Sequence, residues 1–382
     1  MKLIQLCLGS FYIDNYSYQE NLLPKYQKEF VDEVKIIASL VSFDENGKFC
    51  LLPEASKYIN EYNIPVERLE YKKKLGKLAK LLRLYQKDLY AVLEEEKPDI
   101  IFVHGIQFYD IRKVVKYAKK HPEVIIYGDN HADFSNSARG FVSKNILHKI
   151  VWKHCAKIIE PYTKKFYGVL PARVDFLVDV YKLPKEKVEL LVMGCDDIKA
   201  DEAKAPEVRE KIRKMYDIKE DDFLIMTGGK IDLFKTQTLL LMEAVNKIEN
   251  DKVKLIVFGS VVPELKEKIN SLCSDKVKYI GWVKAEDSYK YFAASDLVVF
   301  PGRHSVFWEQ VAGQGIPMIV KYWDGTTHVD LGGNVDFLYN DSADEIKESI
   351  LKAIDSYDTM KNKALEKADV FKYSDIARRS IY

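Results

Sequence analysis

Short apolar runs alternate with longer amphipathic stretches along the whole chain. Runs typical of buried strands occur at 2–8, 34–41, 100–103, 124–127, 156–160, 188–192, 223–227, 254–258, 277–280, 297–300 and 318–320. Helical patterns lie between them at 18–31, 70–96, 110–121, 141–154, 236–249, 262–272, 286–294, 305–314 and 344–368. This alternation predicts an α/β fold in which helices cover both faces of parallel sheets.

A polar, weakly periodic stretch from Gly194 to Pro206 divides the pattern into two similar halves. A chain of 382 residues suits two domains better than one. Two α/β halves joined by one linker predict a cleft, where such proteins usually bind ligands. The chain has no apolar run of membrane-spanning length, so we expect no transmembrane helix.

Charge is divided unevenly between the halves. Residues 1–190 contain 31 Lys and Arg against 25 Asp and Glu, a net charge of +6, and the remainder carries −5. Part of the excess lies at 71–85, where Leu75, Leu78 and Leu82 share one helical face flanked by lysines. Such a helix either lies on an anionic bilayer or packs on its own domain with solvated lysines.

Several nucleotide-binding and metal-binding signatures are absent from the sequence. No Gly-x-Gly-x-x-Gly follows a predicted strand, no loop ends in Gly-Lys-Ser/Thr, and no Asp-x-Asp occurs. The five cysteines are scattered without metal spacing, which predicts reduced, buried thiols in a cytoplasmic protein and no metal site. A bound diphosphate must therefore be held by cationic side chains and backbone N–H groups.

Two lysines bracket the loop that follows the first predicted strand of the second half. The run Gly228-Gly229-Lys230 is followed by Lys235. The glycines allow close approach of a ligand to the backbone, at the sheet edge where α/β proteins bind ligands. Lys230 and Lys235 either neutralise a diphosphate or are solvated loop lysines.

The segment 300–319 carries the most specific pattern: strand, Pro-Gly turn, helix, Gly-x-Pro, strand. A helix that begins near Ser305 would offer the N–H groups of Ser305 and Val306 to a phosphate. Glu309, one turn further on, would accept two ribose hydroxyls, unless it is a solvated helix carboxylate.

This segment resembles the nucleotide-sugar site of GT-B fold glycosyltransferases, especially the retaining family 4, also called glycosyl transferases group 1. The family pattern is Glu, seven residues, Glu, then Ala-x-x-x-Gly-x-Pro. Glu309 matches the second Glu, and Pro301 replaces the first. Other matching pieces follow in family order: Gly228–Lys230 with Lys235, Val192–Asp196, Tyr279–Val283, Ala293–Asp296 and Phe371–Ala377. Because of Pro301, His304 or Arg303 is expected to contact the donor sugar, and retention of configuration is less secure.

In the first half the resemblance concerns residues that follow strands. The loop with Ser10, Tyr18 and Gln19 is similar to the family's acceptor-side loop, and otherwise is a surface loop ahead of a helix. His131, followed by Asp133, resembles the His-Asp of which the His faces the donor sugar. His104, at another strand end, is expected to line the same cleft.

The resemblance implies a GT-B fold: two Rossmann-like domains facing each other across a cleft, with a C-terminal helix that crosses back. Residues 1–194 would bind the acceptor, 195–365 would bind the nucleotide sugar, and 366–382 would return to the first domain. The expected catalytic residues are His131, Lys230, Lys235 and Glu309. The expected substrate contacts are Ser10, Tyr18, Gln19, His104, Asp133, Gly229, His304, Ser305 and Val306.

The expected enzyme is a cytoplasmic hexosyltransferase that needs neither metal nor cofactor. It would move a sugar from a nucleoside diphosphate sugar to a glycan or lipid-linked glycan, with retention and with peripheral contact at the inner face of an anionic membrane. No nucleic-acid partner is expected. Two alternatives stay open: a sugar-nucleotide 2-epimerase of the same fold, and a non-catalytic GT-B binding protein, which the loss of the first Glu would favour. The base, donor sugar and linkage are not specified.

Overall fold

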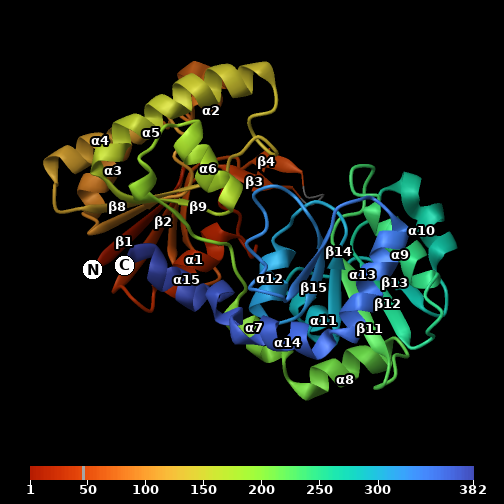
Figure 1. The fold of residues 1–382 in the computed structure, drawn as a ribbon. Helices are drawn as coiled ribbons and strands as arrows, with labels where there is room; N and C mark the ends of the chain where they lie inside the picture. Colours follow the sequence, from red (N-terminus) through yellow and green to blue (C-terminus); the bar gives the residue numbers. More distant parts are fainter. Residues whose placement is uncertain (45–47) are drawn as a thin grey trace. The chain divides into compact units, whose positions relative to one another are not determined.

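The computed structural model describes residues 1–44 and 48–382 (Figure 1). The chain forms two compact units. Unit 1 consists of residues 1–192 together with 376–382, and unit 2 consists of residues 193–375. The sequence pattern and the family resemblance predicted these boundaries after residues 194 and 365.

Unit 1 is built on an eight-stranded sheet, in which only the edge strand β5 runs antiparallel to its neighbour. The spatial order is β10 (Val188–Leu190), β9 (Thr163–Gly168), β8 (Ile125–Asn130), β7 (Ile100–Val103), β1 (Lys2–Cys7), β2 (Glu33–Ser39), β6 (Pro65–Leu69), β5 (Ser56–Ile59). A separate hairpin pairs β3 (Val41–Phe43) with β4 (Phe49–Leu51). The chain builds outward from β1 on one side and from β7 on the other, so the strand order reverses between β1 and β7. Loops at such a reversal are the usual ligand-binding place in open α/β sheets.

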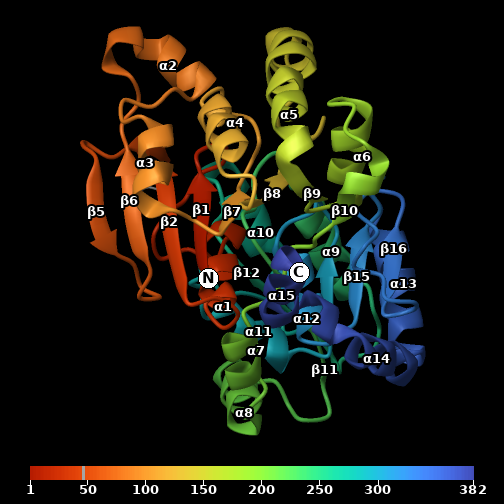
Figure 2. The ribbon, with the colours of Figure 1, turned by 90° about the vertical axis from the view of Figure 1, so that its left-hand side faces the viewer.

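Helices cover both faces of the unit 1 sheet, with α3, α4 and α5 on one face and α1 and α15 on the other (Figures 1 and 2). The helices that belong to unit 1 are α1 (Gln19–Gln27), η1 (Lys73–Leu75), α2 (Gly76–Leu82), α3 (Leu89–Glu96), α4 (Ile111–Lys120), η2 (Val142–Trp152), α5 (Lys153–Ile159), η3 (Glu160–Tyr162), α6 (Pro171–Asp179) and η4 (Lys185–Lys187). The last helix, α15 (Tyr373–Ile381), returns the chain from unit 2 to unit 1. Its end is held by a 2.9 Å hydrogen bond from Tyr127 Oη to the carbonyl of Ile381.

Unit 2 has a six-stranded, fully parallel sheet. The order is β13 (Val277–Tyr279), β12 (Val253–Phe258), β11 (Phe223–Gly228), β14 (Leu297–Phe300), β15 (Met318–Lys321), β16 (Val335–Leu338). Its helices are α7 (Asp197–Ala203), α8 (Pro206–Met215), α9 (Gln237–Asn246), η5 (Pro263–Leu265), α10 (Lys266–Leu272), α11 (Ser288–Ala294), α12 (Phe307–Gly313), α13 (Ala343–Asp355), α14 (Tyr357–Glu366) and η6 (Ala368–Phe371). Here the strand order reverses between β11 and β14, which places the loops after these two strands side by side.

Two helix and strand predictions and one prediction of burial are wrong in instructive ways. Residues 156–160, predicted as a strand, lie in α5 and η3, and the strand is β9. Cys155, Ala156 and Ile159 are buried at helical spacing, and the short apolar run concealed that period. The long helix predicted over 70–96 is broken into α2 and α3, because Arg83 takes a left-handed conformation with φ 54°. Cys273 is also exposed rather than buried.

Candidate functional site

A pocket of about 180 Å³ lies where the loops after β11 and β14 meet in unit 2. Its lining comprises Thr227, Gly228, Gly229, Lys230, Ile231, Lys235, Thr238, Val257, Phe258, Phe300, Pro301, Gly302, Arg303, Ser305, Val306 and Phe307. It therefore brings together five of the predicted unit 2 residues: Gly229, Lys230, Lys235, Ser305 and Val306. It sits at the strand reversal described above, as expected for a ligand site of an α/β sheet.

Glycines shape one wall of this pocket. A Cβ on Gly228 would lie 2.3 Å from the ring of Phe258, and Gly229 has φ 130°. A Cβ on Gly259 would lie 1.8 Å from the carbonyl oxygen of Gly229, so the loops after β11 and β12 pack backbone against backbone. Side chains are excluded from this wall, which leaves the peptide groups near Gly229 accessible to a ligand.

Three cationic side chains surround the pocket: Lys230, Lys235 and Arg303. Lys230 is 63% exposed, and its Nζ lies 3.7 Å from the carboxylate of Asp232, a distance typical of a weak surface pair. Asp232 also forms the turn that carries Lys235, because its carbonyl accepts the Lys235 backbone N–H at 2.9 Å. The pocket thus has the charge that a diphosphate requires.

The helix predicted to begin at Ser305 begins at Phe307, with Val306 as its N-cap. The carbonyl of Ser305 accepts the N–H of Trp308 at 3.0 Å, and that of Val306 accepts the N–H of Gln310 at 3.2 Å. Ser305 and Val306 therefore form the turn that leads into α12 and line the pocket from there.

Glu309 is buried behind the pocket, where two histidines hold its carboxylate. Its Oε1 accepts from Nε2 of His304 and from Nε2 of His328, both at 2.8 Å. Its Oε2 and Nδ1 of His328 have no hydrogen-bond partner among the described residues. Burial raises the pKa of Glu309, but the charges and hydrogen bonds of the two histidines outweigh this and lower it to about 2. Glu309 is therefore a fixed, ionised acceptor with one oxygen left over, and it is not a solvated helix carboxylate.

Sequence reasoning missed His328. The residue lies in the loop between β15 and β16, 19 positions after Glu309. No spacing pattern links the two, and only the parallel arrangement of β14 and β15 brings them together.

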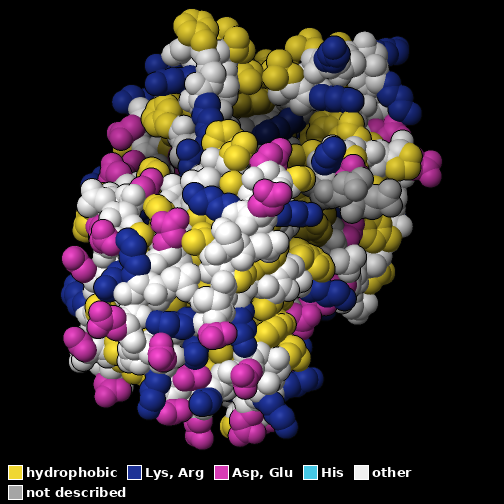
Figure 3. Space-filling model, turned by 90° about the vertical axis from the view of Figure 1, so that its right-hand side faces the viewer, with side chains coloured by type: hydrophobic (Ala, Val, Ile, Leu, Met, Phe, Trp, Pro, Cys, Tyr) yellow, Lys and Arg dark blue, Asp and Glu magenta, His cyan; other side chains and the backbone are white. Residues whose placement is uncertain are grey.

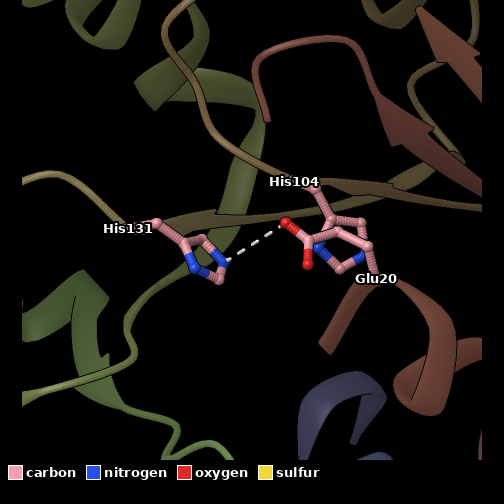
Figure 4. A group of neighbouring side chains, drawn as sticks. All are labelled: Glu20, His104 and His131. Atoms are coloured by element: carbon pink, nitrogen blue, oxygen red, sulfur yellow. Dashed lines mark ion pairs between the residues drawn. The ribbon is translucent and has the colours of Figure 1, made fainter. Parts of the chain in front are cut away.

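In unit 1, a second cluster lies at the reversal between β1 and β7. Figure 4 shows Glu20, His104 and His131 with their side chains directed toward one another. His131 Nε2 lies 3.3 Å from Asp129 Oδ2 and 4.0 Å from Glu20 Oε1. Burial lowers the pKa of His131, yet the two carboxylates raise it above its ordinary value overall. His131 is 27% exposed, which makes it the accessible member of the cluster.

His104 is fully buried, so it does not line an open cleft as predicted. Its Nδ1 lies 2.9 Å from Asp129 Oδ2 and its Nε2 lies 2.7 Å from Gln5 Oε1. Burial raises the pKa of Asp129, but His131 and His104 lower it well below its ordinary value. Asp129, at the end of β8, is the hub that positions both histidines, and sequence reasoning missed it. The one available signal was its place at a strand end.

The other predicted unit 1 residues have mixed surroundings. Gln19 is buried with Nε2 3.5 Å from Asp129 Oδ2, and so belongs to the cluster. Tyr18 is half-buried and stacks on Tyr16. Ser10 is a backbone donor to the carbonyl of His104, and its buried Oγ has no partner among the described residues. Asp133 accepts from Ser135 and from Arg173 Nε, so it caps a loop rather than presenting a free carboxylate.

Two groups of three side chains have metal-ligating atoms within 4.8 Å of one another, which the sequence spacing did not indicate. They are Glu20, His104 and His131 in unit 1, and His304, Glu309 and His328 in unit 2. Both ring nitrogens of His104 are engaged by Asp129 and Gln5, and Oε1 of Glu309 is engaged by both histidines. Hydrogen bonds and charge pairing therefore account for the arrangement of both groups.

Comparison with known proteins finds a family that resembles part of unit 2. The model of glycosyl transferases group 1 matches residues 222–356, which hold β11 to β16 and the pocket. A curated relative, mannosylfructose-phosphate synthase of Agrobacterium fabrum, is 23% identical over 198 residues, which are 48% of this chain and 41% of the relative.

Solved structures extend the likeness to both units and show the GT-B fold. HepE of Anabaena in complex with UDP is 15% identical, with a TM-score of 0.66 over 99% of this chain and 98% of that chain. A glycosyltransferase of Rickettsia africae has the same TM-score and identity, over 99% and 96%. The UDP-GlcNAc 2-epimerase of Neisseria meningitidis is 13% identical, with a TM-score of 0.61 over 99% and 98%. At these identities the likeness extends to the fold alone.

Proposed function

We propose that this protein is a glycosyltransferase that moves a sugar from a nucleoside diphosphate sugar to a glycan or lipid-linked glycan. The observation that carries the proposal is the unit 2 pocket, which combines three cations with a bare glycine wall at the strand reversal, within the residues that match glycosyl transferases group 1. Similar folds have been solved with UDP in HepE and with UDP-2-fluoro glucose in a trehalose-6-phosphate protein of E. coli.

In this proposal the pocket stabilises the leaving nucleotide. Lys230 and Lys235 neutralise the diphosphate as its charge develops, and groups so placed each contribute on the order of a few kcal/mol to transition-state stabilisation. The turn at Ser305 and Val306 supplies backbone donors. Lysines hold the diphosphate here, so no metal ion or cofactor is required.

Glu309 is assigned to the ribose. Its Oε1 is occupied by His304 and His328, so Oε2 is the atom left to accept a hydroxyl. His304 contacts Glu309 and directly precedes Ser305 in the chain, and it is assigned the sugar-side role that Pro301 cannot fill. A carboxylate fixed by two neighbours loses little freedom when it binds its ligand, which favours affinity.

His131 is assigned to the sugar in unit 1, where it is the exposed member of the Asp129 cluster. Its raised pKa keeps it cationic over a wider pH range than a free imidazole, so it donates a hydrogen bond to a sugar oxygen. Tyr18 and Gln19 lie at the start of α1 and are assigned to the acceptor side. An aromatic ring beside an amide suits a sugar's faces and hydroxyls.

For the membrane, we propose peripheral contact through unit 1 at the inner face, where a lipid-linked acceptor would be found. No helix among the described residues is long and apolar enough to cross a bilayer. Support comes from α2 and the turn before it, where lysines surround exposed leucines.

The competing function is a sugar-nucleotide 2-epimerase, which the likeness to the Neisseria epimerase favours. One experiment separates the possibilities: the protein is incubated with UDP-, GDP- and ADP-sugars, with and without a glycolipid acceptor, and all sugar products are identified. Transfer that depends on the acceptor supports the proposal. Release of an epimerised sugar without acceptor supports the epimerase, and donor binding without any turnover supports a non-catalytic binding protein.

A further inference from the structure

Two helical segments of unit 1 expose apolar side chains outward. Exposure is 42–49% for Leu75, Leu78 and Leu81, which lie in and just before α2. It is 44–77% for four residues in and just before η2, namely Phe141, Val142, Ile146 and Ile150. We call these seven residues the apolar ridge. Soluble surfaces rarely expose so many large apolar side chains together, and such patches mark interaction sites.

One side of η2 packs against the rest of unit 1, and the other side exposes apolar side chains. His148 and Trp152 are buried, whereas Val142, Ile146 and Ile150 point away from the core. The spacing of four residues keeps each set along one side of the helix. η2 thus packs within unit 1 through His148 and Trp152, and its apolar side chains at Val142, Ile146 and Ile150 are left exposed.

The two stretches of sequence that carry the apolar ridge are rich in Lys and Arg. The stretch 71–87 contains seven Lys and Arg, and the stretch 134–159 contains five. Neither stretch contains an Asp or Glu, although these make up 58 of the 382 residues. At the upper edge of the molecule, Figure 3 shows hydrophobic side chains (yellow) next to Lys and Arg (dark blue). Lower down, Asp and Glu (magenta) are interspersed with Lys and Arg.

The two segments form one surface. The guanidinium of Arg83, at the end of α2, lies 5.6 Å from the ring centroid of Trp152, at the end of η2. Figure 2 shows α2 and the helix that continues as α5 projecting at the same end of unit 1. The exposed leucines and the exposed η2 residues therefore lie at the same end of unit 1.

We propose that the apolar ridge and its lysines form a docking surface for an anionic bilayer, with η2 as a second anchor beside α2. The apolar side chains enter the boundary between headgroups and acyl chains, and the lysines contact lipid phosphates. A second copy of this chain fits poorly, because it would bring a second set of Lys and Arg side chains against the first. This inference extends the proposed function, in which a lipid-linked acceptor places the enzyme at the membrane.

The test is flotation of the full chain with vesicles of phosphatidylcholine alone or mixed with phosphatidylglycerol. We expect wild-type protein to float with the anionic vesicles about tenfold or more better than with neutral ones, and less so at high salt. The double variants Phe141→Ser/Ile150→Ser and Lys144→Glu/Lys149→Glu should each bind about tenfold more weakly. Ile59→Ser/Met215→Ser, which removes similarly exposed apolar side chains elsewhere, should float like wild type.

Two controls make the outcome decisive. Circular dichroism verifies that each variant is folded, and UDP titration by calorimetry verifies that the unit 2 pocket is unchanged. The inference is overturned if wild type does not float with anionic vesicles, or if the ridge and lysine variants float as well as the control. Self-association that the ridge variants abolish, without flotation, would also overturn it. Flotation without nucleotide binding would instead contradict the proposed function and leave this surface standing.

Discussion

Replacing Glu309 by glutamine preserves the shape of the side chain and removes its charge. The pKa of Glu309 is lowered to about 2 by the two histidines, from an ordinary value of 4.5. A shift of this size corresponds to on the order of 3 kcal/mol of preference for the ionised form in the folded state. Glutamine would also place an amide N–H₂ at the position of Oε2, where no partner lies among the described residues. We therefore expect Glu309→Gln to destabilise unit 2 by on the order of 3 kcal/mol.

Thermal unfolding measures this directly. For a unit of this size, we expect a loss of about 5 to 10 °C in Tm at neutral pH. Because the folded-state pKa is lowered, the stabilisation is fully present above the ordinary pKa and is lost as the pH falls through about 2. The gap between wild type and variant should thus be constant from neutral pH down to the ordinary pKa and shrink below it.

Glu366→Gln, which breaks an exposed pair with Lys363, is the matched control and should change Tm little. If Glu309→Gln unfolds at the wild-type temperature at every pH, Glu309 is not a charged carboxylate stabilised by the two histidines.

Three further predictions concern the pocket and the unit 1 cluster. The double variant Lys230→Ala/Lys235→Ala should bind UDP about tenfold or more weakly, because each charge-assisted hydrogen bond contributes about 1.5 to 3 kcal/mol. Its binding of uridine monophosphate should change much less, and calorimetry measures both affinities. If turnover requires cationic His131, a pH–rate profile should show activity that persists above the ordinary imidazole pKa and falls at higher pH. If the His131→Ala variant has the same profile as wild type, His131 does not take part in the reaction. Gly228→Ala should cost about 1–3 kcal/mol in urea unfolding, because its Cβ would meet the Phe258 ring; an unchanged midpoint would contradict this.

Much of the fold could be predicted because parallel strands buried on both faces leave continuous apolar runs in the sequence. β1, β7, β11, β12 and β14 were all predicted in this way. The errors arose where an element lacks that signature. The end of α2 depends on the left-handed conformation of Arg83, a residue type without an intrinsic preference for it. The short strands β5 and β16 are partly exposed, and their alternation is too brief to recognise.

The candidate site was predicted where its residues are close in sequence, as along 228–235 and 301–309. The partners that hold those residues were not predictable, because they come from distant loops. His328 reaches Glu309 only through the order of β14 and β15, and Asp129 reaches His104 only through the pairing of β7 with β8. A sequence pattern identifies the side chain that meets the ligand more readily than the side chain behind it.

The central claim is that the unit 2 pocket grips a nucleoside diphosphate with lysines. A crystal structure of the protein soaked with UDP tests it most directly. The account predicts diphosphate density between Lys230, Lys235 and the turn at Ser305, with the ribose toward Oε2 of Glu309. A nucleotide bound elsewhere, with these side chains free of contact to it, would contradict the account.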